Sequence, residues 1–325
     1  MNSRSKTSLK GGTMGRAETV AGGLVRAAVL LLIGPLLAGC ITQSRPADVA
    51  LQEGNVHLEN GRYEQAAEAF GRAIAANPAD TRAHFNRARV RYELGEYEQA
   101  VADLNEVIRL EPHGPAAYFN RGCAWDELEN YDAALADYGK AIELDPTDAD
   151  FYNNRGFTLN RTGDHEQAMQ DFREVIRLAP HDPDGYINRS DTYLMLGEYD
   201  KSIADCNTAL RLDPESGVAH FNRGVALLEK QDFEGAEEDL NEAIELDRGF
   251  APAYTKRGLA RLKKGAQFLA IIDFDKAIQL DPEDADAYRH RARAHQESGE
   301  LDKAAADLAR AEQLGQAVEL TGVKD

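Results

Sequence analysis

The sequence predicts an all-α fold, a solenoid of eight helix-turn-helix repeats. A 34-residue pattern recurs from residue 47 to residue 318 without insertion or deletion, and a fixed period of roughly 20–50 residues is typical of repeat architectures. Small residues stand at positions 8 and 20 of every repeat, where they let two helices approach closely. Turn sequences such as Leu94–Tyr97, together with a proline near the end of six repeats, mark where helices stop.

The N-terminal segment, residues 1–39, has the anatomy of a secretory signal. Basic residues precede the apolar run Ala27–Gly39, whose 13 residues are fewer than the about 20 that a membrane-crossing helix needs. The run ends in Leu37-Ala38-Gly39-Cys40, which resembles the lipobox of bacterial lipoproteins. That resemblance implies cleavage before Cys40 and lipidation of its sulfur. Translation from Met1 or from Met14 is compatible with this reading.

The residues after the lipobox bear on where the protein would lie. The lipoprotein resemblance implies a lipid anchor in the cell envelope. By the enterobacterial sorting rule, Ile41 favours the outer membrane, facing the periplasm, although the inner membrane stays open. Residues 40–46 form a linker of at most about 3.6 Å per residue. We therefore expect the repeats to stay close to the membrane.

The repeats occupy nearly all of the remaining chain. They span residues 47–80, 81–114, 115–148, 149–182, 183–216, 217–250, 251–284 and 285–318, with a tail at 319–325. Their pattern resembles the tetratricopeptide repeat (TPR), which implies a right-handed solenoid whose first helices line a concave groove. No long polar capping helix is evident after Gln316. The last repeat is therefore expected to leave an apolar end, open to a homo-oligomer contact or to a partner.

An arginine at position 7 and an aspartate at position 23 occur together in seven repeats, and the first repeat, with Glu53 and Ala69, lacks both. This joint presence predicts an ion pair within each repeat, because pairing with the preceding repeat would place Arg87 opposite Ala69. We interpret these pairs as structural. The predicted pairs are Arg87–Asp103, Arg121–Asp137, Arg155–Asp171, Arg189–Asp205, Arg223–Asp239, Arg257–Asp273 and Arg291–Asp307.

Asparagine stands at position 6 of five successive repeats without a matching partner residue. The five are Asn86, Asn120, Asn154, Asn188 and Asn222. In TPR proteins this position faces the groove, and an amide can both donate to and accept from a peptide backbone. The row resembles the asparagine ladder of the O-GlcNAc transferase repeats, which implies binding of an extended peptide. The alternative is that these amides bond neighbouring helices. Apolar groove contacts are expected at position 5 from Phe85, Phe119, Ile187 and Phe221.

Several function classes are disfavoured by composition. A net charge of −19 would repel nucleic acid. Little chain lies outside the signal and the repeats, so we expect no catalytic domain, and the scattered histidines predict neither a metal site nor a cofactor. Cys206 replaces an aromatic at position 24 and is expected to be buried. Cys123 is expected on the concave side, where a reactive thiol is an open alternative.

Together these features predict a membrane-anchored interaction scaffold or adaptor in the periplasm. Its ligands would be extended segments of periplasmic or envelope proteins. The alternative is an accessory lipoprotein for exopolysaccharide export, or for the assembly of outer-membrane proteins or pili. A glycan ligand is the weaker expectation, because the single tryptophan, Trp125, stands at position 11, usually a core position.

Overall fold

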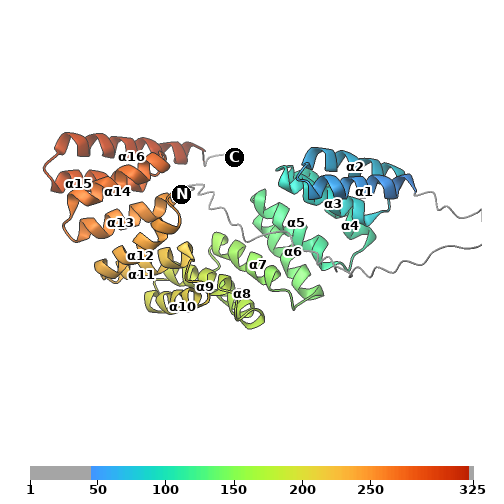
Figure 1. The fold of residues 1–325 in the computed structure, drawn as a ribbon, viewed down its shortest axis with the longest axis horizontal. Coiled ribbons are helices and arrows are strands. Elements are labelled where there is room, and N and C mark those ends of the chain that lie inside the picture. Colours follow the sequence, from blue (N-terminus) through green and yellow to red (C-terminus); the bar gives the residue numbers. More distant parts are fainter. Residues whose placement is uncertain (1–44, 322–325) are drawn as a thin grey trace, which may run out of the picture. The chain divides into compact units, whose positions relative to one another are not determined.

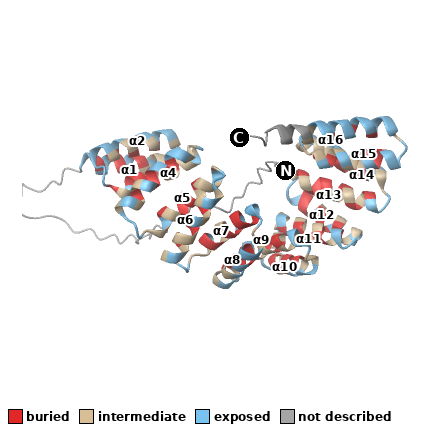
Figure 2. Cartoon of the chain, turned by 180° about the vertical axis from the view of Figure 1, so that it is seen from behind, coloured by how far each residue is buried: buried red, intermediate tan, exposed pale blue. Residues whose placement is uncertain are grey.

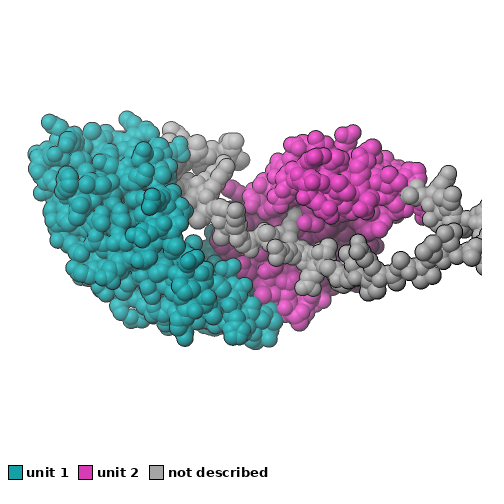
Figure 3. Space-filling model, in the orientation of Figure 1, with its two compact units in different colours: residues 1–9, 159–325 teal, residues 10–158 magenta. Residues whose placement is uncertain are grey.

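The computed structural model describes residues 45–321, and every regular element in that range is an α-helix (Figure 1). The predicted signal peptide and Cys40 lie outside the described residues, as do residues 322–325. The described chain divides into two compact units, an N-terminal unit of residues 45–158 and a C-terminal unit of residues 159–321 (Figure 3). The predicted all-α solenoid of TPR-like repeats is confirmed as the fold class.

Two helices form each repeat, and their bounds follow the predicted period. The N-terminal unit holds α1 (Pro46–Glu59), α2 (Tyr63–Ala76), α3 (Thr81–Glu93), α4 (Tyr97–Leu110), α5 (Pro115–Glu127) and α6 (Tyr131–Leu144). The boundary between the units falls inside α7 (Ala149–Thr162). The C-terminal unit continues with α8 (His165–Leu178), α9 (Asp184–Met195), α10 (Tyr199–Leu212), α11 (Gly217–Glu229), α12 (Phe233–Leu246), α13 (Ala251–Lys263), α14 (Gln267–Leu280), α15 (Ala285–Glu297) and α16 (Leu301–Thr321).

The turn between the two helices of a repeat is built on a residue with positive φ. Gly95 and Gly197, predicted to end their helices, have φ of 75° and 72°. Glycine adopts this left-handed conformation without the steric penalty of a Cβ atom. Glu129 and Gln231 occupy the same place in two other repeats, with φ of 58° and 64°. Those two turns therefore carry strain that the glycine turns avoid.

The last helix is longer than the sequence analysis expected. Helix α16 has 21 residues and continues to Thr321, three residues into the segment expected to be a tail. In six repeats a proline at position 32 stops the second helix, whereas the last repeat has Gln316 there. Without that proline, the residues that follow can extend the helix.

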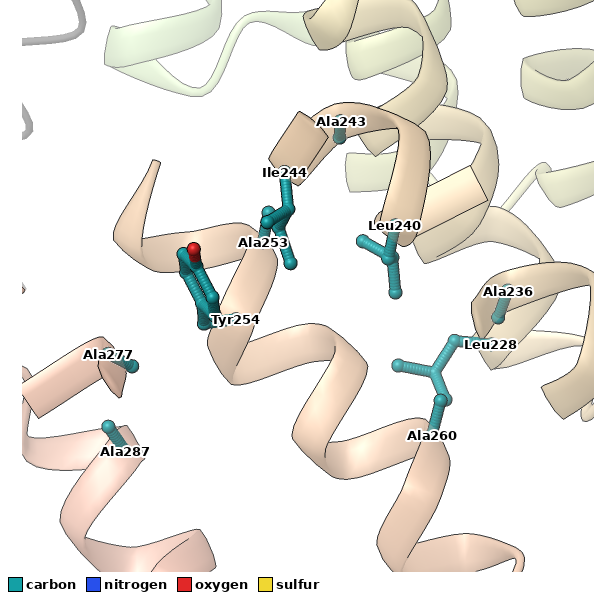
Figure 4. Packing of buried hydrophobic residues seen from close by; sticks show 10 residues of the cluster. All are labelled: Leu228, Ala236, Leu240, Ala243, Ile244, Ala253, Tyr254, Ala260, Ala277 and Ala287. Atoms are coloured by element: carbon teal, nitrogen blue, oxygen red, sulfur yellow. The ribbon is translucent and has the colours of Figure 1, made fainter. Parts of the chain in front are cut away.

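The core lies between neighbouring helices, and small buried residues let these helices pack closely. In each unit, buried residues lie on the helix sides that face other helices, and exposed residues lie on the outer sides (Figure 2). In the C-terminal unit, Leu228 of α11 packs among alanines that include Ala236 of α12 and Ala260 of α13 (Figure 4). The predicted position-20 residues are all buried: Ala66, Ala100, Ala134, Ala168, Ser202, Ala236, Ala270 and Ala304.

Position 8 is small because the side chain at position 24 lies against it. A Cβ atom built on Gly258 would lie 2.7 Å from the ring of Phe274, and one on Gly122 would lie 2.8 Å from the ring of Tyr138. The second and eighth repeats carry alanine at position 8, and both have leucine at position 24. Glycine at position 8 therefore makes room for the ring at Gly122 and Gly258, and in the sixth repeat Gly224 stands against a leucine, with a built Cβ atom 2.9 Å from Leu240.

Candidate functional site

The arginine–aspartate pairs join the two helices of a repeat. Six of the seven predicted pairs lie inside one unit, and in each the arginine donates from Nε and Nη2 to the two carboxylate oxygens. In Arg257–Asp273 these distances are 3.1 and 2.6 Å. All six aspartates are buried. The seventh pair, Arg155 with Asp171, has its residues in different units.

Four of these arginines also bond to the preceding repeat, which the sequence analysis missed. Their Nη1 atoms donate to a side-chain oxygen at position 25 of that repeat, at 2.6–2.7 Å. The four contacts are Arg121–Asn105, Arg223–Asn207, Arg257–Asn241 and Arg291–Asp275. A polar residue recurs at position 25 in these repeats and is the signal that could have revealed the contact. The geometry supports a structural role, because one guanidinium ties three helices together.

The asparagine row does not form a uniform open ladder. Asn120 and Asn222 are only 3% and 4% exposed, so the predicted ladder is wrong for these two residues. Asn120 and Asn154 donate to carbonyl oxygens of their own helices, at 2.7 and 2.9 Å. The amides of Asn86 and Asn222 reach the first helix of the preceding repeat: Asn86 donates to Asn55 Oδ1 at 2.9 Å and Asn222 to Ser190 Oγ at 3.1 Å. These contacts favour the alternative in which the asparagines bond helices.

Most of the expected apolar groove residues pack between repeats instead. Phe119 and Ile187 are buried, and the Phe119 ring lies 4.9 Å from that of Phe151 in the next repeat. Phe221 is half-buried, with its ring 4.8 Å from Phe250. Phe85 is also half-buried, against the α4–α5 cluster. Position 5 therefore fills the space between successive first helices, and its side chains are largely unavailable to a ligand.

The candidate site is a pocket in the C-terminal unit, with a volume of about 520 Å³. First helices α11, α13 and α15 contribute most of its lining, together with the turn and start of α12. Its residues are Leu228, Glu229, Gln231, Phe233, Leu259, Lys263, His290 and Arg293. None was predicted as a site residue. The helices contact one another in the order α9, α11, α13, α15, and we call the side of these four first helices that carries the pocket the groove face.

The pocket combines an apolar lining with basic groups. Leu228 is buried, and Phe233 and Leu259 are half-buried, so they offer an apolar surface. Lys263 is exposed and makes no ion pair within residues 45–321. Arg293 donates from Nε to Glu297 Oε1 at 3.0 Å, and both side chains are partly exposed. The pocket can therefore hold an apolar side chain next to an anionic group.

His290 takes the place of asparagine at position 6 of the last repeat. Its ring stacks on Phe274 with centroids 5.9 Å apart. Burial lowers the pKa of His290, and the nearby charges of Lys256 and Arg293 lower it further, although Asp286 and Asp284 act against them. The ring is therefore neutral at pH 7 and offers one donor and one acceptor.

The cysteines have the chemistry of packing residues. Burial raises the pKa of Cys206 to about 11 and that of Cys123 to about 12. Both thiols are therefore protonated at neutral pH, which disfavours the reactive thiol considered for Cys123. Among the residues that the structure describes, no group of three or more histidine, cysteine or acidic side chains is arranged to hold a metal ion. Within the same range, no helix combines the length and the apolar character needed to cross a bilayer.

Solved structures with the same fold include two that cover most of the chain. A tetratricopeptide repeat protein from Parabacteroides merdae is 17% identical, with a TM-score of 0.64, over 77% of this chain and 98% of that one. A chain of the APC/C hetero-tetramer Cut9–Hcn1 is 15% identical, with a TM-score of 0.63, over 85% of this chain. The match spans only 54% of that longer chain. At these identities the likeness concerns the fold.

Comparison of the sequence with models of known protein families agrees with the fold. No curated protein matches the chain. A tetratricopeptide repeat model matches residues 51–115, 187–250 and 256–318, more than half of the sequence. Two further models of the same repeat match residues 127–163 and 149–182, which fill part of the interval. The chain therefore belongs to the tetratricopeptide repeat family.

Proposed function

We propose that this chain is a lipid-anchored interaction scaffold of the bacterial periplasm, which binds extended segments of envelope proteins on the groove face of its C-terminal unit. Its family points to a protein–protein interaction scaffold, and tetratricopeptide repeat proteins are generally non-enzymatic. The observation that carries the proposal is the pocket shared by α11, α13 and α15. A ligand that fills it must touch at least three successive repeats, which suits an elongated segment.

The character of the pocket supports a peptide ligand. Ligand sites are mostly apolar clefts of about 300–1,000 Å³ with a few polar groups that fix orientation. Leu228, Phe233 and Leu259 supply the apolar part, and Lys263 and Arg293 supply charge. The position-6 amides carry no part of this proposal. Those of Asn86, Asn120, Asn154 and Asn222 donate hydrogen bonds to other groups of the protein itself.

Leu259→Glu is expected to abolish partner capture while the protein stays folded. The substitution places a carboxylate on the apolar lining, where a bound apolar side chain would desolvate it. The full chain, purified in detergent, serves as bait for an envelope extract, and captured proteins are quantified by mass spectrometry. The matched control is Leu269→Glu on α14, a leucine that is 44% exposed and outside the pocket.

The supporting outcome is a set of proteins retained by wild type and by Leu269→Glu but reduced about tenfold or more by Leu259→Glu. Thermal unfolding of both variants should stay close to wild type. If Leu259→Glu folds normally and captures the same proteins in the same amounts, the pocket is not the binding site.

The lipid anchor is tested at Cys40, which precedes the described residues. The motif Leu37–Cys40 motivates the proposal, and two or more acyl chains hold a protein stably at a membrane. Intact mass spectrometry of membrane-extracted protein should give an N-terminus at Cys40 with a lipid modification. Labelled fatty acid should enter the wild type and not Cys40→Ser. A mature N-terminus elsewhere, or an unmodified Cys40, would contradict the anchor.

A further inference from the structure

The groove face of the C-terminal unit changes its charge from one end to the other. Position 9 of four successive repeats holds Asp191, Val225, Leu259 and Arg293, each 34 residues after the one before. Leu259 and Arg293 line the pocket, so their equivalents on α9 and α11 belong to the same face. The helices that carry them are consecutive neighbours. The row therefore runs from an acid, over two apolar residues, to a base.

The acidic end is reinforced by a second carboxylate on α9. Asp184 stands seven residues before Asp191, and residues seven apart lie on the same side of a helix. Neither side chain makes an ion pair with a described residue. Burial raises the pKa of both carboxyl groups, with Asp182 and Asp213 adding to the effect at Asp184. Nearby His165 acts against it at Asp191. Asp191 is half-buried, whereas Asp184 is exposed. A cation from a ligand would relieve the desolvation of Asp191 and the repulsion of Asp184 by its acidic neighbours.

The basic end is reinforced by two lysines of α13. Lys256 and Lys263 form no ion pair within the described residues, so their charges remain available to a ligand. Arg293 shares its charge with Glu297, and Arg289 shares its charge with Asp286 at 2.5 Å. Glu229 is the acidic residue of the pocket lining. The unpaired lysines therefore give this end its excess positive charge, in a chain whose net charge is −19.

The middle of the face is apolar and open. Val218 and Met195 are 44% and 53% exposed. Val225 of α11 is half-buried. These residues continue the apolar lining of the pocket toward α9. A ligand that lies along the face meets carboxylates first, then apolar side chains, and then lysines and an arginine.

We infer that the groove face selects a bipolar segment of a partner protein, with a basic residue held at α9, apolar residues over α11, and an acidic residue held at α13 and α15. This inference rests on the proposed function and specifies the chemistry of its ligand. Neighbouring helix axes lie about 8–10 Å apart, so α9 is separated by roughly 16–20 Å from α13 and by roughly 24–30 Å from α15. An extended chain rises about 3.3 Å per residue. The two charged residues therefore stand about five to nine residues apart.

The experiment reverses charges on the peptide and on the protein separately. The probes are nine-residue synthetic peptides on an array, with a lysine at one end, leucine and valine in the middle and a glutamate at the other end. Companion peptides carry two lysines or two glutamates around the same apolar residues. The full chain in detergent is tested as wild type, Asp191→Lys and Lys263→Glu, and affinities of selected peptides are measured by fluorescence anisotropy.

Wild type should bind the lysine–glutamate peptides about tenfold more tightly than either companion set. Asp191→Lys should lose this preference and bind the two-glutamate peptides best, whereas Lys263→Glu should bind the two-lysine peptides best. Each rescue identifies the end of the ligand that the substituted residue contacts. A structural role for either residue would weaken all peptides equally.

Equal binding of all three sets by wild type, no binding at millimolar peptide, or variants without matched rescue would overturn the inference. These outcomes leave the proposed function separately testable. If Leu259→Glu still prevents capture of envelope proteins while the charge exchanges fail, the groove binds a partner that is not bipolar. If Leu259→Glu has no effect, the proposed function itself fails.

Discussion

Asp273→Ala is expected to lower the free energy of unfolding of the C-terminal unit by about 3–5 kcal/mol. Asp273 is 1% exposed and accepts from Arg257 Nε and Nη2 at 3.1 and 2.6 Å. It also accepts from Arg261 Nη1 at 2.9 Å. Removing the carboxylate leaves two half-buried guanidinium groups without this partner, and a buried charge that loses its partner is strongly destabilising.

Asp275→Ala is the matched control on the same helix. The Asp275 side chain is 56% exposed and forms one contact, with Arg291 at 2.6 Å. An exposed pair contributes about 0–1 kcal/mol. Hydrogen exchange of amides in α13–α15 should measure both effects locally, because a repeat array need not unfold in two states. A loss at Asp273 no larger than at Asp275 would contradict the structural role of the pair.

A combined substitution distinguishes the cost of leaving a buried charge unpaired from the cost of losing the ion pair as a whole. In Arg257→Met/Arg261→Met/Asp273→Leu, the charges of Arg257, Arg261 and Asp273 are replaced by apolar side chains of similar bulk. Glu237, which also contacts Arg261 at 2.8 Å, keeps its ion pair with Lys264 at 3.0 Å. Such replacements are often neutral or stabilising, because no ion has to be desolvated. We expect this variant to recover most of the stability that Asp273→Ala loses. Failure to recover would mean that the geometry of the ion pair is required for packing.

Gly258→Ala is expected to destabilise the C-terminal unit by about 1–3 kcal/mol, although alanine is the better helix former. The new Cβ atom would lie 2.7 Å from the Phe274 ring, and Phe274 is fully buried. The ring cannot move without opening the packing around it. Chemical denaturation of the full chain, with hydrogen exchange in α13 and α14, measures the effect.

The rescue and the control both follow from the structure. Adding Phe274→Leu should reduce the cost of Gly258→Ala, because Ala88 and Ala292 occur naturally where position 24 is leucine. The cost should not vanish, since a Cβ atom on Gly224 would lie 2.9 Å from Leu240. The control is Gly71→Ala in α2, whose Cβ would meet only Arg87 Nη1 at 3.6 Å. There the helix propensity of alanine should stabilise by up to about 1 kcal/mol. Equal effects at Gly71 and Gly258 would contradict the steric explanation.

The sequence was sufficient for the fold because each positional rule recurs in most or all of the eight repeats. A glycine opposite a ring, or an arginine that appears with an aspartate, is uninformative once but decisive when it recurs at a 34-residue spacing. The pairs Arg87–Asp103 and Arg257–Asp273 could be predicted in this way. The contact of Arg257 with Asn241 could also have been predicted, from the polar residue that recurs at position 25.

The candidate site could not be predicted in the same way. Asn120 and Asn154 turn to carbonyl oxygens of their own helices, and Asn222 is buried against the preceding repeat, although all occupy one position. Side-chain direction depends on how closely successive repeats pack, which the period does not encode. The pocket arises where the repeats differ, since Leu259 and Lys263 have no identical equivalent in another repeat.

The arginine contacts between repeats have a mechanical consequence. They link the fifth repeat to the sixth, the sixth to the seventh and the seventh to the eighth through Arg223, Arg257 and Arg291. Earlier in the chain, Gly71 and Gly139 stand at the position that would accept the bond. Under tension along the chain, the last four repeats should resist as one block, whereas the earlier repeats, of which the second and third are joined through Arg121 and Asn105, should separate in smaller pieces. A pull from the N-terminal side would then be absorbed by early repeats before it disturbed the groove face.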